Sequence, residues 1–211
     1  MTKFQKIYQA VMDGEDGIAC EQALFLINQG HPAMKIINDG LIAAMNEVGM
    51  LFKEGELFVP EVMMSAQTVS EAIEVLKPHM EGEMDIRGRV VIGTVKGDLH
   101  DIGKNLVALL LSSNGFEVFD LGNDVAPEDF VAAAKEHNAD LIALSALLTT
   151  TMINMEATIL ELQAAGIRDK VKVMIGGAPV TAEFAAEINA DGYSQDAQGA
   201  VDFANKTMGE K

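Results

Sequence analysis

The stretch VVIGTVKGDLHDIGKNLV, residues 90–107, sets the plan of the second half of the chain. Its first part, Val90–Val95, is a continuous apolar run, typical of a strand that is buried on both faces of a sheet. Lys104 and the apolar residues after it predict a helix. The segment from Gly97 to Gly103 therefore forms a loop between a strand and its helix, and such loops are where open α/β sheets bind ligands.

His100 lies in the middle of this loop, two residues after Asp98. A neutral imidazole is a good ligand for a transition metal, and a ligating histidine is commonly oriented by a carboxylate behind it. The alternative is a polar loop in which His100 only hydrogen-bonds its neighbours. A short motif leaves both interpretations open until its context is known.

Strand and helix patterns alternate from residue 87 to the end of the chain. The predicted strands are Val90–Val95, Glu117–Asp120, Leu141–Ser145, Val171–Ile175 and a short one at Gly192 and Tyr193. The predicted helices are Lys104–Ser113, Pro127–His137, Met152–Ala165, Thr181–Ile188 and Ala197–Thr207. Five such units with nearly continuous apolar strands predict a doubly wound, five-stranded parallel sheet of the flavodoxin-like, Rossmann-like type.

Residues 1–86 have a helical period instead. Four amphipathic helices with short connections are expected, near residues 4–11, 18–28, 32–54 and 60–76, and they predict a small four-helix bundle. The polar segment Glu81–Gly88 is the expected linker and hinge. The sequence thus predicts two domains, 1–86 and 87–211.

Composition excludes several classes of function. The net charge of −17 argues against nucleic acid and against anionic membranes, because both would repel the chain. One cysteine allows no internal disulfide, no stretch is long enough to span a membrane, and the first residues lack the apolar core of a signal peptide. We therefore expect a cytoplasmic protein.

Small and hydroxyl residues follow two other predicted strands. Ser145 through Thr151 comes after the third strand, and Gly176 and Gly177 come after the fourth. Taken singly, the hydroxyls could cap the next helix and the glycines could form a turn. Because all these loops leave the same edge of the sheet as the His100 loop, we expect them to form one site.

The run GDLHDIGKNLV, with its D-x-H-x-x-G pattern, resembles the cobalamin-binding domains of methyltransferases, which include methionine synthase and small corrinoid proteins. The resemblance implies that His100 binds cobalt as lower axial ligand, in place of the cofactor's own benzimidazole. It also implies a relay from His100 through Asp98 to the hydroxyl of Thr151. The loop residues expected to contact the cofactor are Gly97, Asp98, Leu99, His100, Asp101, Ile102 and Gly103.

The same resemblance extends to two further parts of the chain. It implies that the nucleotide tail of the cofactor contacts Ser145, Leu147, Thr149, Gly176, Gly177, Tyr193 and Ala197. It also implies that the helical bundle is a cap over the upper face of cobalt. The matching apolar residues of that cap are Phe52 and Val59, and the second of these is usually leucine in methionine synthase.

The function implied by this resemblance is that of a non-catalytic methyl carrier. The chain would bind cobalamin or a related corrinoid, as methylcobalamin in its loaded form. It would accept a methyl group from a substrate-specific methyltransferase and pass it to a second methyltransferase, with a reductive activation protein as a further partner. The alternatives are the cobalamin-binding subunit of a radical mutase, a cobalamin-dependent sensor, and a receiver-like or flavin-binding domain.

Overall fold

The computed structural model describes residues 4–80 and 86–208. The chain divides into two compact units, Met1–Asp85 and Ile86–Lys211. Residues 81–85 of the predicted linker lie outside the described residues. In the described part of the chain, no helix is both long enough and apolar enough to cross a membrane.

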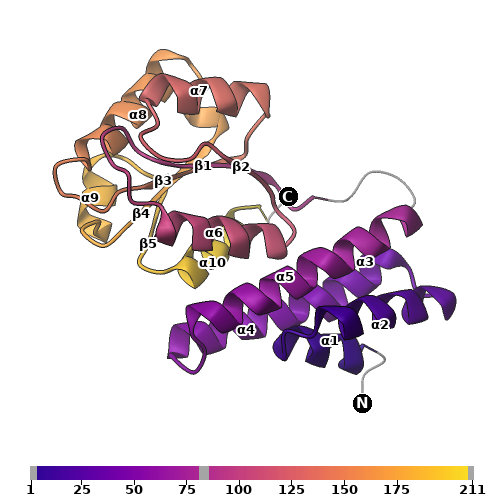
Figure 1. The fold of residues 1–211 in the computed structure, drawn as a ribbon. Helices are drawn as coiled ribbons and strands as arrows, with labels where there is room; N and C mark the ends of the chain where they lie inside the picture. The colour runs from indigo at the N-terminus through magenta and orange to yellow at the C-terminus, as the bar shows by residue number, and fades with distance from the viewer. Residues whose placement is uncertain (1–3, 81–85, 209–211) are drawn as a thin grey trace. The chain divides into compact units, whose positions relative to one another are not determined.

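Over residues 4–80, every regular element of the first unit is a helix, and these helices pack against one another (Figure 1). They are α1 (Gln5–Met12), α2 (Asp16–Asn28), α3 (Ala33–Ile36), the π-helix η1 (Ile37–Ile42), α4 (Ala43–Glu54), α5 (Val59–Leu76) and the 3-10 helix η2 (Lys77–His79). Because α3, η1 and α4 follow one another without a break, they form the third of four helical stretches. The predicted four-helix bundle is therefore confirmed.

The start of α5 shows how local sequence sets a helix boundary. Glu61 reaches back, and its Oε2 accepts a hydrogen bond from the backbone N–H of Phe58 at 2.8 Å. Pro60 lies in the first turn, where its missing N–H costs nothing. The apolar stripe that follows, which includes Val62, Ala66 and Val69, is buried as its spacing predicts.

The π turn of the third helical stretch was not expected. Gly40, within η1, packs so closely on α1 that a Cβ atom there would lie 2.8 Å from Ile7 Cγ2. The wider turn also keeps two adjacent apolar pairs buried, Ile36 with Ile37 and Leu41 with Ile42. The regular α-helix predicted from spacing is therefore wrong here, because a tertiary contact with α1 decides the local geometry.

The second unit is a five-stranded sheet in the order β2-β1-β3-β4-β5, with every pair parallel. This order confirms the predicted flavodoxin-like plan. Its strands are β1 (Arg89–Thr94), β2 (Glu117–Asp120), β3 (Leu141–Ser145), β4 (Lys172–Gly176) and β5 (Gly192–Ser194). Its helices are α6 (Ile102–Ser113), α7 (Pro127–Glu136), α8 (Ile153–Ala164), the short 3-10 helix η3 (Arg168–Lys170), α9 (Ala182–Glu187) and α10 (Ala197–Met208).

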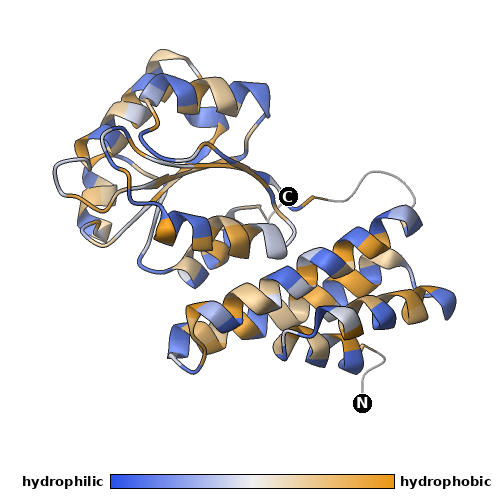
Figure 2. Ribbon diagram, in the orientation of Figure 1, coloured by the Kyte–Doolittle hydropathy of each residue, from blue (hydrophilic) through white to orange (hydrophobic). Residues whose placement is uncertain are grey.

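Helices cover both faces of this sheet. Figure 1 shows α6 and α10 on one face and α7 and α8 on the other. Figure 2 shows that the strands are mainly apolar, whereas the helices alternate between apolar and polar positions. The central strands are buried because both of their faces are covered, which explains their uninterrupted apolar sequences.

The ends of some elements differ from the predicted ranges. The fourth strand runs from Lys172 to Gly176, one residue later than predicted, because Gly176 still pairs with Ser145 and with Ser194. Helix α6 begins at Ile102, two residues before the predicted Lys104. At the carboxyl edge of the sheet, the later end of β4 changes where its loop begins, and the earlier start of α6 changes where the loop after β1 ends.

Replacing Gly40 with alanine tests the packing of the π turn against α1. The added methyl group would overlap Ile7, and we expect this crowding to lower the free energy of unfolding by about 1–3 kcal/mol. The matched control is Gly17→Ala in α2, where nothing lies within 4 Å of the new Cβ and the free energy should stay equal or rise. Urea unfolding monitored by circular dichroism measures both, and equal values for the two variants would contradict this account.

Candidate functional site

The carboxyl ends of neighbouring strands lie level with one another. In the sheet register, Thr94 pairs with Ser145, Ser145 with Gly176, and Gly176 with Ser194. The loops that follow these strands therefore leave the sheet side by side. Such an edge is the ligand-binding edge of an open α/β sheet.

The Asp98 side chain is completely buried and joins two of these loops. Its Oδ1 accepts hydrogen bonds from the backbone N–H of His100 at 3.1 Å and from Nδ1 of the same histidine at 2.8 Å. Its Oδ2 accepts from Thr151 Oγ1 at 2.7 Å and from the N–H groups of Leu147 at 2.8 Å and Leu148 at 3.2 Å. One carboxylate thus ties the loop after β1 to the loop after β3.

These hydrogen bonds decide the charge of Asp98. Burial by itself would raise the pKa of its carboxyl, but the hydrogen bonds from Thr151, His100 and Leu147 hold that pKa well below its usual range. Asp98 is therefore ionised and acts only as an acceptor. It follows that Nδ1 of His100 carries the proton and that, in the neutral ring, Nε2 has a free lone pair.

His100 is placed so that its ring is partly open to solvent. Its side chain is 52% exposed, although the partner carboxylate is buried. Thr94 Oγ1 donates a hydrogen bond to the His100 carbonyl oxygen at 3.1 Å and so helps to fix the backbone of His100. Hydrogen bonds link His100 to Asp98 and Asp98 to Thr151, as the predicted relay requires, and the role of this relay at a metal remains a prediction.

Large apolar side chains are exposed in the same two loops. Leu99 and Ile102 flank His100 in the sequence and are 69% and 84% exposed, and Leu147 and Leu148 follow β3. Gly97, Asp101 and Gly103 complete the loop and the first turn of α6. Exposed apolar groups gathered around one imidazole indicate a ligand with a large apolar surface.

The glycines after β4 have a structural reason of their own. At Gly177, where φ is 129°, a Cβ atom would lie 1.9 Å from the carbonyl oxygen of Ala146. At Gly176 it would lie 3.0 Å from the carbonyl oxygen of Ser194. The backbone after β4 therefore packs directly against its neighbours, and only glycine fits at Gly177.

The other residues predicted to contact the nucleotide tail lie at or near the same edge. Ser145 ends β3 and is half-buried, and Thr149 is exposed on the loop after it. Tyr193 lies in β5 opposite Ile175, and Ala197 is the buried first residue of α10. Their contact with a ligand remains a prediction.

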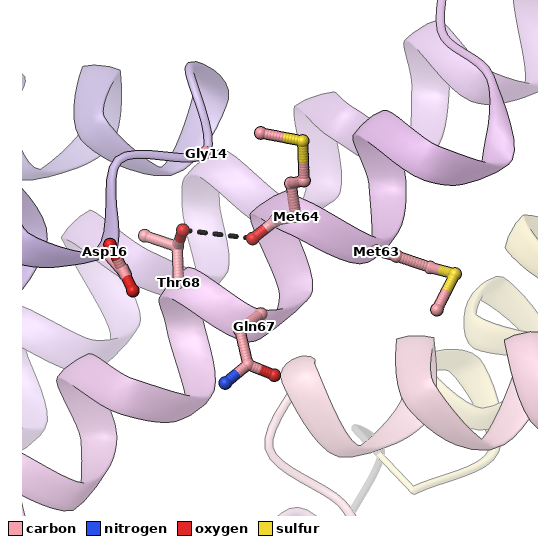
Figure 3. Close-up of a pocket in the computed structure, with 6 residues that line it drawn as sticks. All are labelled: Gly14, Asp16, Met63, Met64, Gln67 and Thr68. Carbon is pink, nitrogen blue, oxygen red and sulfur yellow. Dashed lines mark hydrogen bonds between the residues drawn. The ribbon is translucent and has the colours of Figure 1, made fainter.

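The two predicted cap residues lie in the helical unit. Phe52 is half-buried in the last turn of α4, and Val59 is the exposed first residue of α5, next to the exposed Phe58. The helical unit also has a pocket, which lies elsewhere on α5 (Figure 3) and is lined by Gly14, Asp16, Met63, Met64, Gln67 and Thr68. The shielding role of Phe52 and Val59 remains a prediction.

Three residues that support the His100 loop were missed in the sequence. They are Thr94, Asn154, whose Nδ2 donates to the Lys96 carbonyl oxygen at 2.7 Å, and Asp124, whose Oδ1 accepts from the Gly97 N–H at 2.8 Å. The sequence signal that could have found them was their position: Thr94 ends β1, Asn154 lies in the first turn of α8, and Asp124 lies in the loop between β2 and α7. Their partners are distant in sequence, so spacing alone could not pair them.

Comparison with known proteins identifies the kind of ligand. Two family profiles, both described as B12 binding domain, match residues 88–202 and 3–77. A corrinoid protein of Desulfitobacterium hafniense is 39% identical over 214 residues, covering 100% of this chain and 99% of that protein. Dimethylamine corrinoid protein 1 of Methanosarcina acetivorans is 50% identical over 176 residues, covering 82% of this chain and 83% of that protein.

A solved structure agrees with these matches. The methanol:cobalamin methyltransferase complex from Methanosarcina barkeri matches with a TM-score of 0.88 and 33% sequence identity, covering 99% of this chain and 80% of the matched chain. Sequence and fold therefore point to the same family. The resemblance predicted from the D-x-H-x-x-G pattern is confirmed.

Replacing Asp98 with asparagine tests the buried carboxylate. The new amide would turn its NH₂ group toward hydrogen-bond donors, and we expect unfolding to cost about 2–4 kcal/mol less near neutral pH. Because the folded-state pKa of Asp98 is below its unfolded value, the stabilisation is present at higher pH and is lost as pH falls below about 4. The difference between wild type and variant should therefore shrink in acid.

The control for this measurement is Asp101→Asn, at a side chain that is only half-buried in the same loop. Its free energy of unfolding should change by less than about 0.5 kcal/mol at any pH. Urea unfolding across the acid range, with no ligand added, measures how the free energy of unfolding depends on pH for wild type, Asp98→Asn and Asp101→Asn. A pH-independent difference between wild type and Asp98→Asn would contradict the assignment of an ionised, hydrogen-bonded Asp98.

Proposed function

Because the chain belongs to the B12-binding family, we propose that it is a corrinoid protein that carries methyl groups between two methyltransferases. A bound corrinoid supplies a cobalt ion that can hold a methyl group. The chain itself supplies the pocket, the axial ligand and the surfaces that its partners recognise. On this proposal it has no complete active site and works as a cofactor-bearing substrate of its partner enzymes.

The observation that carries this proposal is the hydrogen-bonded pair of Asp98 and His100. It leaves Nε2 of an exposed imidazole with a free lone pair, and imidazole nitrogen suits cobalt as well as other transition metals. The exposed side chains of Leu99, Ile102 and Leu147 offer an apolar surface that suits the face of a corrin ring. The residues present therefore fit the cofactor of the family.

The relay residues have separate tasks. Asp98 fixes the tautomer and the orientation of His100, and Thr151 fixes Asp98 by donating to its Oδ2. Together they hold His100 in the tautomer whose Nε2 can serve as a ligand atom.

The partners follow from the same reasoning. One structural relative belongs to a methanol:cobalamin methyltransferase complex, and one sequence relative is named for dimethylamine. We propose a substrate-specific methyltransferase as the donor partner of this chain, a second methyltransferase as the acceptor partner, and a reductive activation protein. The mutase and sensor alternatives are less favoured, because these relatives belong to methyl-transfer systems.

Replacing His100 with glycine tests the axial ligand. The chain reconstituted with hydroxocobalamin should have a visible spectrum that depends on His100, and His100→Gly should change that spectrum because the imidazole is removed. Added free imidazole should restore it. His79→Gly, at an exposed histidine of the helical unit, is the matched control and should leave the spectrum as in wild type.

A different result would separate the parts of this proposal. If His100→Gly binds hydroxocobalamin with an unchanged spectrum, His100 is not the axial ligand. If the wild-type chain binds no corrinoid at all, the strand-end loops serve another ligand. In that case the carrier function is refuted as well.

Transfer of a radiolabelled methyl group tests the carrier function directly. We reconstitute the chain with labelled methylcobalamin and add a purified thiol methyltransferase of a methylamine system together with its thiol. On the carrier proposal, label should appear on the thiol only when both proteins are present, because the partner enzyme binds the acceptor. Transfer by the chain alone would show that it is itself an enzyme, and no transfer with any such partner would refute the carrier role.

A further inference from the structure

The loop between β2 and α7 is fastened to the end of β1. Leu121 N donates to the carbonyl oxygen of Ile92 at 2.8 Å, Thr94 N donates to that of Gly122 at 2.9 Å, and Val125 N donates to that of Thr94 at 3.0 Å. An isolated parallel bridge between Val95 and Val125 continues this pairing past the end of the strand. The residues between Gly122 and Val125 are thus held directly beside the His100 loop.

Asp124 uses this position to hold the His100 loop at two consecutive residues. Its Oδ1 accepts from the backbone N–H of Gly97 at 2.8 Å, and its own N–H donates to the carbonyl oxygen of Asp98 at 3.0 Å. Lys96 Nζ lies 3.6 Å from the same Oδ1, but both side chains are about half exposed. The hydrogen bond from Gly97 lowers the pKa of the Asp124 carboxyl, so this acceptor is ionised.

The backbone of Asp124 is in a conformation that most residues avoid. Its φ is 53°, in the left-handed region, which aspartate and asparagine tolerate better than residues with longer side chains. This conformation brings both the N–H and the side chain of one residue to the His100 loop. The left-handed backbone of Asp124 therefore helps to hold the His100 loop in place.

Asp98 is consequently held from two sides. Its carboxylate is fixed by Leu147, Leu148 and Thr151 from the loop after β3, and its main chain is fixed by Asp124 from the loop after β2. The direction from which Oδ1 meets Nδ1 of His100 depends on both anchors. A shift of the Asp98 backbone would turn the imidazole even if every hydrogen bond of the carboxylate survived.

We infer that Asp124 is a positioning residue for His100, which acts through the backbone of Gly97 and Asp98 to hold the histidine in its ligating orientation. This inference rests on the proposed function, since it concerns the orientation of the proposed axial ligand. Asp124 itself need not touch the cofactor. The exposed ion pair with Lys96 contributes little, because exposed pairs of this kind are weak.

Four variants separate the hydrogen bond from the other features of Asp124. Asp124→Ala and Asp124→Gly both remove the acceptor, and glycine also removes the strain of the left-handed backbone. Asp124→Asn keeps a carbonyl acceptor and tolerates the same φ, so it should rescue. Asn138→Ala is the matched control, because Asn138 has a φ of 50° but lies between α7 and β3, at the end of the helix.

The first measurement uses the chain without cofactor. Amide hydrogen exchange at Gly97, followed by NMR, should be about tenfold faster in Asp124→Ala and Asp124→Gly, because the hydrogen bond that protects it is lost. Asp124→Asn should stay within about twofold of wild type. Asn138→Ala should lower the melting temperature but leave exchange at Gly97 as in wild type, and Lys96→Met should leave it unchanged as well.

The second measurement uses the chain reconstituted with cob(II)alamin and isotopically labelled histidine. Electron paramagnetic resonance then reports the fraction of cobalt whose axial nitrogen comes from histidine. The ratio of histidine-bound to histidine-free cobalt should fall by about tenfold in Asp124→Ala and Asp124→Gly and recover in Asp124→Asn. Asn138→Ala should match wild type.

The outcomes distinguish this inference from the proposed function. Normal histidine ligation in wild type together with unchanged ligation in Asp124→Ala overturns the role of Asp124 alone. Equal losses in Asp124→Ala and Asn138→Ala also overturn it, since they show a general effect of destabilisation. If wild type binds no corrinoid at all, the proposed function is refuted. The role of Asp124 toward the metal is then refuted as well.

Discussion

The site depends on the burial of one carboxylate. A fully buried Asp98 is stable only when its lone pairs are occupied, because an ionised group without partners is costly in a protein interior. Donors on its own loop supply two of the hydrogen bonds, and donors on the loop after β3 supply three. The requirement to satisfy Asp98 therefore brings two loops together that are some fifty residues apart in sequence.

The same requirement explains why His100 can be exposed and yet well oriented. Nδ1 bonds to a carboxylate that several hydrogen bonds hold in place, and the histidine side chain is still half exposed. A histidine held only by packing would have to be buried to be rigid, and it would then be unavailable as a ligand. Here the buried, rigid group is Asp98, so His100 can be well oriented and still accessible to a ligand.

Much of the fold could be predicted from the sequence, because it follows from local patterns. The strands are recognisable since a parallel sheet covered on both faces needs continuous apolar runs, and Val90–Val95 is such a run. The π turn at Ile37–Ile42 could not be predicted, because it depends on the approach of Ile7 to Gly40 from another helix. Asp98 and His100 stood out by their place in a strand-end loop, and Thr151 was predictable as their partner only through resemblance to a known family. Asp124 has no signal except its place in the loop between β2 and α7.

The glycines after β4 show that one sequence motif can be explained either by packing within the fold or by ligand binding. A paired glycine in a strand-end loop can be read as room for a ligand, but Gly177 is required by the carbonyl of Ala146 before any ligand is considered. That close contact joins the loops after β3 and β4, just as Asp98 joins those after β1 and β3. The strand-end loops are thus fixed to one another by backbone contacts and by one buried charge, and the ligand meets an edge that is already assembled. Preorganisation of this kind lowers the cost of ordering the loops on binding, since the fold has already positioned them.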